Sequence, residues 1–328
     1  MVGASALPIF ADIEAAAKRI EGFAVETPLL ESRKLNAIVG GRILLKPECL
    51  QRTGSFKFRG AWNAVSKLKK SGAAKAIVAF SSGNHAQGVA AAAQIARLPA
   101  MIVMPSDAPA IKIANTRDYG AEVVTYDRVK ESREEIAALI AKERHAAIVP
   151  PFDHPDVIAG QGTCGLELIS KAKALGTDID DIVVCCSGGG LTAGIALAAE
   201  ALSPRTRVHT AEPEGFDDYA RSLLSGKRER NAANAGSICD ALLSPTPGEL
   251  TFAINKPRLG PGYAVSDAEV REAIRFAFET LKLVVEPGGA VALAAVLTGK
   301  IPAKNRAIGV VLSGGNIDAA LMAEILRG

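Results

Sequence analysis

The chain has 328 residues, 48% of them hydrophobic and 22% charged, with a formal net charge of +3. This balance is typical of a soluble globular protein with one large domain or two moderate ones. Because the charge is small and no Lys/Arg block stands out, it supports neither a nucleic-acid partner nor a membrane-surface role. No apolar run reaches the roughly 18 residues that suggest a transmembrane helix. Met1–Phe10 lacks the basic and apolar regions of a secretion signal, so secretion is not expected.

The five cysteines stand at positions 49, 164, 185, 186 and 239 and show no metal-ligand spacing. Because their number is odd, they cannot all pair within the chain. We expect reduced, buried thiols in a cytoplasmic protein.

Short apolar runs alternate along the chain with Ala-rich amphipathic stretches. The predicted strands are residues 43–45, 76–80, 100–104, 122–126, 147–149, 182–186, 208–211 and 307–312. The predicted helices include residues 86–96, 111–119, 133–143, 166–175, 191–202, 268–281, 290–297 and 317–326. Gly120, Gly176 and Gly299 stand where C-terminal helix caps are expected. Strands that alternate with helices, and that are apolar throughout, predict an α/β fold with mainly parallel sheet.

The βα units between residues 76 and 149 are compact and regular. We interpret 76–149 as a small domain inserted into a larger one, which residues 1–75 and 150–328 form. No internal repeat or low-complexity linker interrupts this organisation.

The strongest local motif is an apolar strand that runs through Ser187-Gly188-Gly189-Gly190-Leu191 into an Ala-rich helix. Three bare backbones allow N–H groups to converge, and the start of the helix adds positive potential, so an anion such as phosphate fits. The spacing matches neither the dinucleotide fingerprint nor the P-loop. The alternative is a tight turn without a ligand.

Two further glycine-containing junctions follow predicted strands. Ser81-Ser82-Gly83-Asn84-His85 gathers amides and hydroxyls at the start of a helix, which suits a carboxylate. Taken alone, its serine or asparagine is more often a helix cap, and its histidine a hydrogen-bonded structural residue. Ser313-Gly314-Gly315-Asn316 places a hydroxyl at the carboxyl end of a strand, where α/β sheets bind ligands. Together with the turn Glu286-Pro287-Gly288-Gly289, these junctions indicate a site at one edge of the sheet.

Lys57 lies between two phenylalanines at the expected start of a helix. Desolvation and the helix dipole both lower the pKa of such a lysine, which favours the neutral amine that attacks an aldehyde. The alternative is an ordinary lysine on a helix surface.

Four motifs occur in a fixed order along the chain. They are Ser55-Phe56-Lys57-Phe58-Arg59-Gly60-Ala61, Ser81 to His85, Ser187 to Leu191, and Ser313 to Asn316. The set resembles the serine/threonine dehydratase and serine racemase family of fold-type II pyridoxal phosphate enzymes. Further matches are Thr27-Pro28-Leu29, Pro151 to Pro155 and Gly160 to Thr163, so the resemblance covers nearly the whole chain. It implies two domains, each with a mainly parallel sheet flanked by helices, of which the large one binds the cofactor.

The resemblance implies a role for each motif. Lys57 would form the Schiff base with pyridoxal 5′-phosphate, and Phe56 would pack near its ring. Asn84 would bond the 3′-oxygen of the ring, and Ser313 would face the ring nitrogen. The phosphate would be held by the backbone amides of Ser187, Gly188, Gly189, Gly190 and Leu191. The α-carboxylate of the substrate would be bound by Ser81, Ser82, Gly83, Asn84 and His85.

The reaction that the resemblance implies is α,β-elimination of water from an amino acid of the L-serine or L-threonine type, which gives a 2-oxo acid and ammonia. Lys57 would remove the α-proton. A serine at 313, in place of a carboxylate, leaves the ring nitrogen essentially neutral and favours loss of the β leaving group. Ser82 matches a residue that protonates the opposite face of the substrate in racemase-like members, so it permits serine racemisation.

Arg133 raises the question of a second substrate carboxylate. It follows Ser132, which with Glu135 is interpreted as a capping box. A cation in the first turn of a helix opposes the helix dipole, unless Glu131 or Glu134 offsets it. In racemase-like relatives an arginine at this place contacts a second carboxylate, which makes 3-hydroxyaspartate, with oxaloacetate as its product, the alternative substrate.

The loop from Glu212 to Asp218 is acidic and follows a predicted strand. By resemblance, Glu212, the carbonyl of Phe216 and Asp218 form a Mg²⁺ site, with Ca²⁺ or Mn²⁺ as alternatives, because hard cations take oxygen ligands. The other reading is a solvated acidic loop.

Other readings remain open. Cysteine synthase shares the fold type, but its asparagine loop typically reads Thr-Ser-Gly-Asn-Thr, and His85 favours the dehydratase branch. A non-catalytic protein that binds the cofactor is an alternative of another class, whereas a nicotinamide-dependent dehydrogenase lacks its glycine fingerprint. The resemblance implies a homodimer. The chain ends soon after residues 317–326, which implies no regulatory domain and no feedback control by isoleucine.

Overall fold

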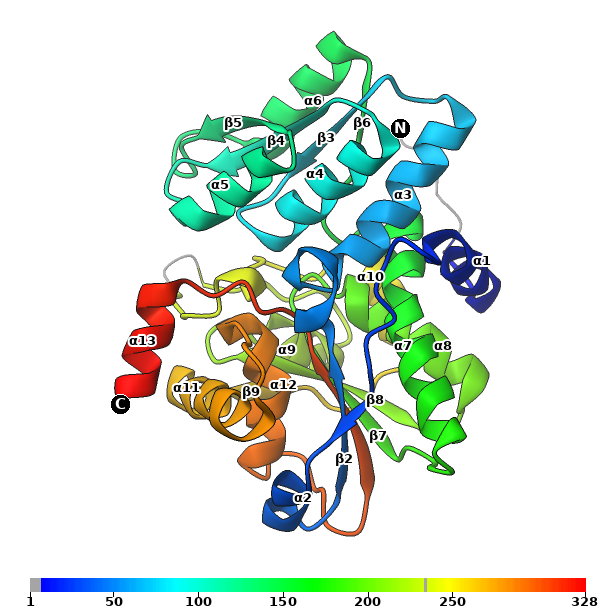
Figure 1. The fold of residues 1–328 in the computed structure, drawn as a ribbon, viewed down its shortest axis with the longest axis vertical. Helices are drawn as coiled ribbons and strands as arrows, with labels where there is room; N and C mark the ends of the chain where they lie inside the picture. The colour runs from blue at the N-terminus through cyan, green and yellow to red at the C-terminus, as the bar shows by residue number, and fades with distance from the viewer. Residues whose placement is uncertain (1–6, 233–234) are drawn as a thin grey trace.

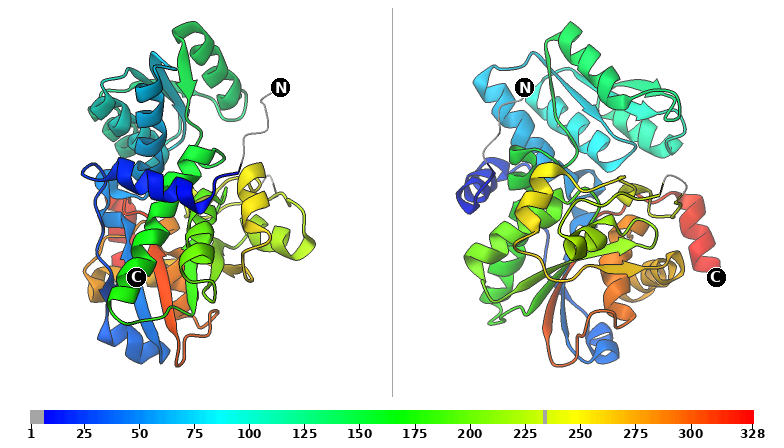
Figure 2. Two further views of the ribbon diagram at one scale, coloured as in Figure 1. Left: turned by 90° about the vertical axis from the view of Figure 1, so that its right-hand side faces the viewer. Right: turned by 180° about the vertical axis from the view of Figure 1, so that it is seen from behind.

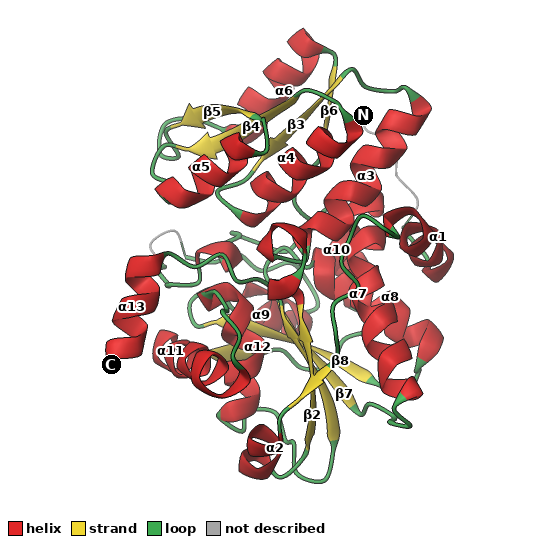
Figure 3. Cartoon of the chain, in the orientation of Figure 1, coloured by secondary structure: helices red, strands yellow, loops and turns green. Residues whose placement is uncertain are grey.

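The computed structural model describes residues 7–232 and 235–328. The chain folds into an upper body around a four-stranded sheet and a lower body around a six-stranded sheet (Figure 1). Figure 2 shows the same two bodies from the side and from behind, and Figure 3 shows helices packed around each sheet. None of the described helices is long and apolar enough to cross a membrane.

The lower sheet has the strand order β1-β2-β10-β7-β8-β9. Only β1 and β2 pair antiparallel, and every other neighbouring pair is parallel. The strands are β1 (Leu30–Glu31), β2 (Arg42–Pro47), β7 (Asp181–Cys185), β8 (Arg207–Pro213), β9 (Tyr263–Val265) and β10 (Ala307–Leu312).

The upper sheet has the order β5-β4-β3-β6 and is parallel throughout. Its strands are β3 (Ala76–Phe80), β4 (Ala100–Pro105), β5 (Glu122–Tyr126) and β6 (Ala146–Ile148). The predicted α/β architecture with mainly parallel sheets is therefore confirmed.

The helices alternate with these strands along most of the chain. They are α1 (Phe10–Ile20), α2 (Arg33–Val39), α3 (Lys57–Ser71), α4 (Asn84–Ala96), α5 (Ala110–Asp118), α6 (Arg133–Arg144), α7 (Pro155–Ala174), α8 (Gly190–Leu202), α9 (Asp218–Ser225), α10 (Glu249–Asn255), α11 (Asp267–Phe276), α12 (Pro287–Leu297) and α13 (Ala319–Arg327). Gly120, Gly176 and Gly299 have φ of 79°, 66° and 71°, as the predicted caps require.

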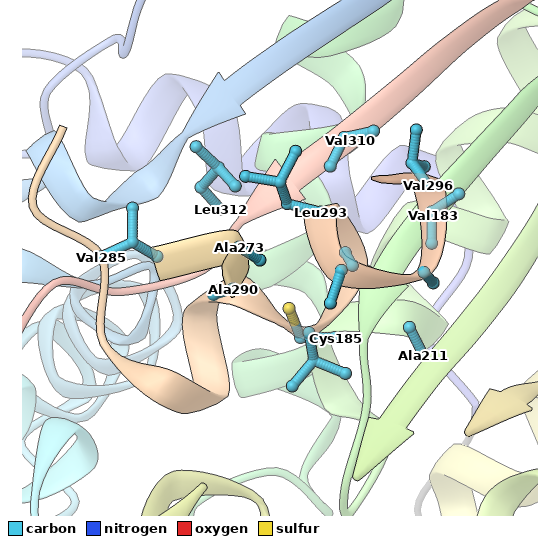
Figure 4. Close-up of a cluster of buried hydrophobic side chains, with 14 of the residues drawn as sticks. Val183, Cys185, Ala211, Ala273, Val285, Ala290, Leu293, Val296, Val310 and Leu312 are labelled. Carbon is cyan, nitrogen blue, oxygen red and sulfur yellow. The ribbon is translucent and has the colours of Figure 1, made fainter. Parts of the chain in front are cut away.

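Both faces of the lower sheet are buried, because successive side chains of a strand point to opposite sides. Val310 and Leu312 pack with α12 in one core, whereas Val311 between them packs with α7 and α8 in another. Figure 4 shows Leu293 of α12 beside Val310 and Leu312. Burial on both faces explains why these strands are apolar throughout.

The prediction for α7 was wrong at its start, because the helix begins at Pro155 and not at residue 166. Gly160 and Gly162 lie inside the helix, at close crossings with α3 and α8. A Cβ on Gly160 would lie 2.6 Å from the Cα of Gly60, and one on Gly194 would lie 2.4 Å from the N of Gly162. The predicted helix 268–281 ends as an α-helix at Phe276 and continues as a π-helical segment, Ala277–Leu281.

The four upper strands all lie within the predicted inserted segment 76–149. Helix α3, which precedes that segment, packs on α4 of the upper body as well as on α7. The exact domain boundaries therefore stay a prediction. Residues 1–6 and 233–234 of the predicted large domain lie outside the described residues.

Candidate active site

A cavity of about 550 Å³ lies between the two bodies. Three strands end at this cavity. Ser81 follows β3, Ser187 follows shortly after β7, and Ser313 follows β10. The carboxyl ends of parallel strands are where α/β sheets bind ligands. All the residues predicted to bind cofactor or substrate line this cavity, namely Phe56, Lys57, Ser81, Ser82, Gly83, Asn84, His85, Arg133, Ser187, Gly188, Gly189, Gly190, Leu191 and Ser313.

Lys57 is the first residue of α3, and its Nζ donates to the carbonyl of Pro151 at 2.8 Å. Burial lowers the pKa of Lys57 from 10.5 to about 8, with Glu286 opposing the shift. Nζ lies 5.1 Å from the centre of the Phe56 ring. A substantial fraction of this amine is therefore neutral near physiological pH, as attack on an aldehyde requires.

The glycine loop before α8 is tightly constrained. Gly189 has a φ of 90°, and a Cβ on it would lie 2.3 Å from the hydroxyl of Tyr219. A Cβ on Gly188 would lie 2.4 Å from the ring of Phe152. Only glycine therefore fits at these two positions without a shift of the neighbouring ring.

The carbonyl groups of this loop are held by the protein. Thr251 Oγ1 donates to the carbonyl of Gly188 at 2.6 Å, and Asn255 Nδ2 donates to that of Gly189 at 3.2 Å. The first N–H groups of α8 have no partner within the helix. Fixed carbonyls and free amides at the start of a helix fit a phosphate group.

Asn84, the first residue of α4, is bonded through both polar atoms of its side chain. Its Nδ2 donates to Glu286 Oε1, and its Oδ1 accepts from Asn316 Nδ2 at 2.8 Å. Because an amide nitrogen carries two hydrogens, one N–H of Asn84 stays free to meet a ligand. This arrangement is compatible with the predicted bond to the cofactor ring.

His85 is 1% exposed, and its Nε2 lies 2.8 Å from the carbonyl of Val149. Burial and the nearby Lys57 lower its pKa to about 3. The ring is therefore neutral and bonded to the backbone, which matches the structural reading given for this histidine above. Binding of the substrate by His85 stays a prediction.

Arg133 begins α6, where Ser132 caps the helix by accepting from the N–H of Glu135 at 3.2 Å. The Arg133 guanidinium makes two local contacts: it donates to Glu134 Oε1 at 2.8 Å, and it lies 5.2 Å from the centre of the Phe80 ring. It also faces the cavity.

Sequence reasoning assigned no role to three residues at the site. Glu286 is 1% exposed and precedes α12, Lys112 of α5 is 4% exposed, and Asp240 lines the cavity beside Lys112. Burial raises the pKa of Glu286 to about 7. The only sequence signal for any of them was the glycine-rich turn that follows Glu286.

The residues predicted to bind a metal ion lie apart from the cavity, at the end of β8 and the start of α9. Glu212 accepts from the N–H groups of Tyr219 and Ala220 at 3.0 and 2.8 Å, and Asp218 accepts from Asn231 at 2.6 Å. The other oxygen of Asp218 is buried without a partner.

Burial disfavours the charged forms of these two carboxylates, although Arg221 acts on Asp218. Burial raises the pKa of Glu212 far above its usual range and that of Asp218 to about 6. A cation would relieve both, so the residues present fit one. Within the described ranges, no group of three or more His, Cys, Asp or Glu side chains could hold a metal. The predicted site needs only two carboxylates and the carbonyl of Phe216.

Comparison with known proteins agrees with this geometry. The family model "Pyridoxal-phosphate dependent enzyme" matches residues 20–314. The L-threo-3-hydroxyaspartate ammonia-lyase of Pseudomonas sp is 44% identical, over 98% of this chain and 99% of that protein.

Two solved structures have the same fold. A threonine deaminase from T.th. is 45% identical with a TM-score of 0.89, over 95% of this chain and 99% of that one. Maize serine racemase is 36% identical with a TM-score of 0.92, over 98% of both chains. This chain therefore belongs to the pyridoxal-phosphate dependent enzymes of fold-type II, in the serine/threonine dehydratase and serine racemase family.

Proposed function

We propose that this protein is a pyridoxal phosphate-dependent ammonia-lyase that removes water from β-hydroxy amino acids, and that it prefers 3-hydroxyaspartate. The observation that carries the preference is the Arg133 guanidinium in the cavity wall. A guanidinium suits a second carboxylate, which serine and threonine lack. The 44% identical relative that is named for this activity supports the same choice.

Each motif would hold one part of the reacting system. The amides of Ser187 to Leu191 would bind the cofactor phosphate, and the loop Ser81 to Asn84 would bind the α-carboxylate of the substrate. When bound, the cofactor supplies a sink for the electron pair of the Cα–H bond. Ser313 would face the ring nitrogen with a neutral hydroxyl.

Lys57 would remove the α-proton, because its lowered pKa leaves the amine partly neutral and able to accept a proton. The elimination breaks the Cα–H and Cβ–O bonds and releases water. Hydrolysis of the unsaturated product then gives oxaloacetate and ammonia from 3-hydroxyaspartate, or pyruvate and ammonia from serine.

The test offers serine, threonine and 3-hydroxyaspartate separately to the wild type and to Arg133→Ala. Loss of a paired charge costs about 2–4 kcal/mol, so kcat/KM for 3-hydroxyaspartate should fall about 30- to 1,000-fold, with serine turnover changed far less. Arg144→Ala, at the exposed end of the same helix, is the matched control. Unchanged turnover of 3-hydroxyaspartate in Arg133→Ala would refute the preference.

Serine or threonine is the second candidate substrate. The bond from Arg133 to Glu134 favours it, because a guanidinium that is already paired is less available to a substrate. If serine or threonine has the highest kcat/KM in the wild type and Arg133→Ala leaves it unchanged, the protein is a serine/threonine dehydratase.

We also propose that Mg²⁺, with Ca²⁺ or Mn²⁺ as alternatives, binds Glu212, Asp218 and the carbonyl of Phe216. The unpartnered buried oxygen of Asp218 supports this site. An ion at about 100 times its dissociation constant stabilises the folded state by about 2.7 kcal/mol. Thermal unfolding of chelator-treated protein should therefore shift upward with Mg²⁺, and the shift should vanish in Asp218→Asn but persist in Glu214→Gln, an exposed neighbour.

A cytoplasmic homodimer is the assembly that we propose from the family resemblance. The described cysteines support a reducing environment, since all five are free. Light scattering of the purified protein tests the dimer.

A further inference from the structure

Lys112 carries a buried ammonium group that the proposed reaction does not use. It belongs to α5 of the upper body, is 4% exposed, and lines the cavity. Its Nζ donates to Asp240 Oδ2 at 2.5 Å and lies 3.8 Å from Glu286 Oε2. Both carboxylates belong to the lower body, so one buried charge joins the two bodies across the cavity.

The same side chain packs against the loop that precedes α4. A Cβ on Gly83 would lie 2.8 Å from Cδ of Lys112 and 3.2 Å from its Nζ. Gly83 is therefore in contact with the lysine stem, and a larger residue there would displace it. Lys112 thus covers the middle of the loop proposed to bind the α-carboxylate.

Glu286 connects Lys112 to the next residue of this loop. Its Oε2 faces Lys112, and its Oε1 accepts from Asn84 Nδ2. Gly314 lies directly against the carboxylate, because a Cβ there would lie 2.1 Å from Oε1. The contacts form a continuous path from Asp240 through Lys112 and Glu286 to Asn84.

We propose that Lys112 is a positioning residue, whose ammonium, bound between Asp240 and Glu286, holds the Ser81–Asn84 loop against the lower body in the geometry that binds the amino-acid substrate. The inference rests on the proposed function only in assigning that loop to the substrate carboxylate. It does not depend on which β-hydroxy amino acid is preferred.

Charge supports a specific role for the ammonium beyond the packing of its stem. Buried carboxylates are costly unless they are paired, and Lys112 is the cation nearest to Glu286 among its described neighbours. The charged and titratable groups that act on Glu286 are Lys112, Lys57 and Asp240, besides the amide of Asn84. Because Lys112 lowers the pKa of Glu286, its loss should raise that pKa further.

The test compares Lys112→Met, which keeps the length of the stem without the charge, with Lys112→Arg, which keeps the charge. In Lys112→Met, KM for the best substrate should rise about 10- to 100-fold, with a smaller fall in kcat. Affinity for pyridoxal phosphate should stay within about threefold, because the phosphate loop and Lys57 are untouched and Asn84 keeps its bond with Asn316. In Lys112→Arg, KM should stay close to the wild-type value. The acid limb of the kcat/KM profile should move to higher pH in Lys112→Met.

Asp240→Asn removes the opposite partner and should raise KM in the same direction, which keeps the test decisive if Lys112→Met does not fold. Lys67→Met is the matched control, since Lys67 pairs with Asp156 at an exposed position away from the cavity. Values of KM within about twofold of wild type in both Lys112→Met and Asp240→Asn would overturn the inference. A rise in KM of the same size in the control Lys67→Met would also overturn the inference.

Failure of this inference can be distinguished from failure of the proposed function. The substrate profile of the wild type decides the function. Binding of an amino acid can be followed separately, by the change in cofactor absorbance on its addition. If that change needs the same amino-acid concentration in wild type and Lys112→Met, the inference fails whatever the wild type turns over.

Discussion

The backbone N–H of Phe56 donates to the carbonyl of Ser313 at 3.1 Å. Ser55 and Gly314 form an isolated antiparallel bridge beside this bond. The contact joins two motifs from opposite ends of the chain, so that Lys57 and the Ser313 side chain enter the same cavity. Because it uses only backbone atoms, the side chain of Ser313 can be changed without breaking it.

Ser313→Ala should therefore weaken binding of pyridoxal phosphate without unfolding the protein. Loss of one hydrogen bond, about 1 kcal/mol, corresponds to about a fivefold rise in the dissociation constant. Titration of the cofactor-free protein measures this, and circular dichroism checks the fold. An unchanged dissociation constant would mean that the hydroxyl makes no bond to the cofactor.

The rate at which cofactor-free protein reacts with pyridoxal phosphate should depend on pH through Lys57. With a pKa of about 8, about half of the Lys57 amine is neutral at pH 8 and about nine-tenths is neutral one pH unit higher. The rate should rise about tenfold per pH unit below pH 8 and then level off. Stopped-flow absorbance measures it, with Lys57→Ala as the control for other lysines. A rate that continues to rise toward pH 10.5 would contradict the lowered pKa.

Much of the site could be predicted because its motifs are local. The glycine loop at 188–190 and the hydroxyl of Ser313 each follow an apolar strand, and parallel strands bring their carboxyl ends together. Lys57 taken alone could equally be an ordinary surface lysine, and the order of the other motifs along the chain is what pointed to it. The structure places all three in one cavity, while the role of each stays a prediction.

The contacts between the two bodies could not be predicted. Lys112 of α5 meets Asp240 and Glu286 only once the upper body lies beside the lower one. Neither Lys112 nor Asp240 belongs to a local motif, and the turn that begins with Glu286 says nothing of its partners. The start of α7 was missed for a similar reason. Its glycines disfavour a helix locally, whereas the close approach of α3 and α8 requires them.

Arg59 should contribute strongly to stability. It is fully buried and donates to both oxygens of Glu48, at 2.7 and 2.8 Å, and to both oxygens of Glu167. Arg59→Met leaves these carboxylates without the guanidinium. The free energy of unfolding should therefore fall by about 3–5 kcal/mol.

Urea unfolding of the cofactor-free protein measures this loss. Arg42→Met is the control, because its ion pair with Glu31 is partly exposed and should contribute less than about 1 kcal/mol. Equal losses of unfolding free energy in Arg59→Met and Arg42→Met would show that the burial of Arg59 adds nothing to stability.

Ser82→Ala should separate racemisation from elimination. Ser82 lines the cavity in the loop before α4, and racemisation needs a second proton donor on the face of the substrate opposite Lys57. Elimination also gives a proton to the leaving β-hydroxyl, but at Cα it needs only the proton removal by Lys57 and no donor on the opposite face. Removal of a general acid costs about 10²- to 10⁴-fold, so serine racemisation should fall by at least about a hundredfold while oxo-acid formation stays within about threefold.

Chiral chromatography of the residual serine and an assay of pyruvate measure the two reactions in one sample. Ser106→Ala, an exposed serine of the upper body, is the matched control. Racemisation that persists in Ser82→Ala would assign the second proton transfer to another group. The loop can bind the α-carboxylate through the backbone N–H of Ser82, which Ser82→Ala keeps. A parallel loss of both reactions would instead assign the hydroxyl of Ser82 to that binding, because the carboxylate contact is common to both pathways and the proton transfer is not.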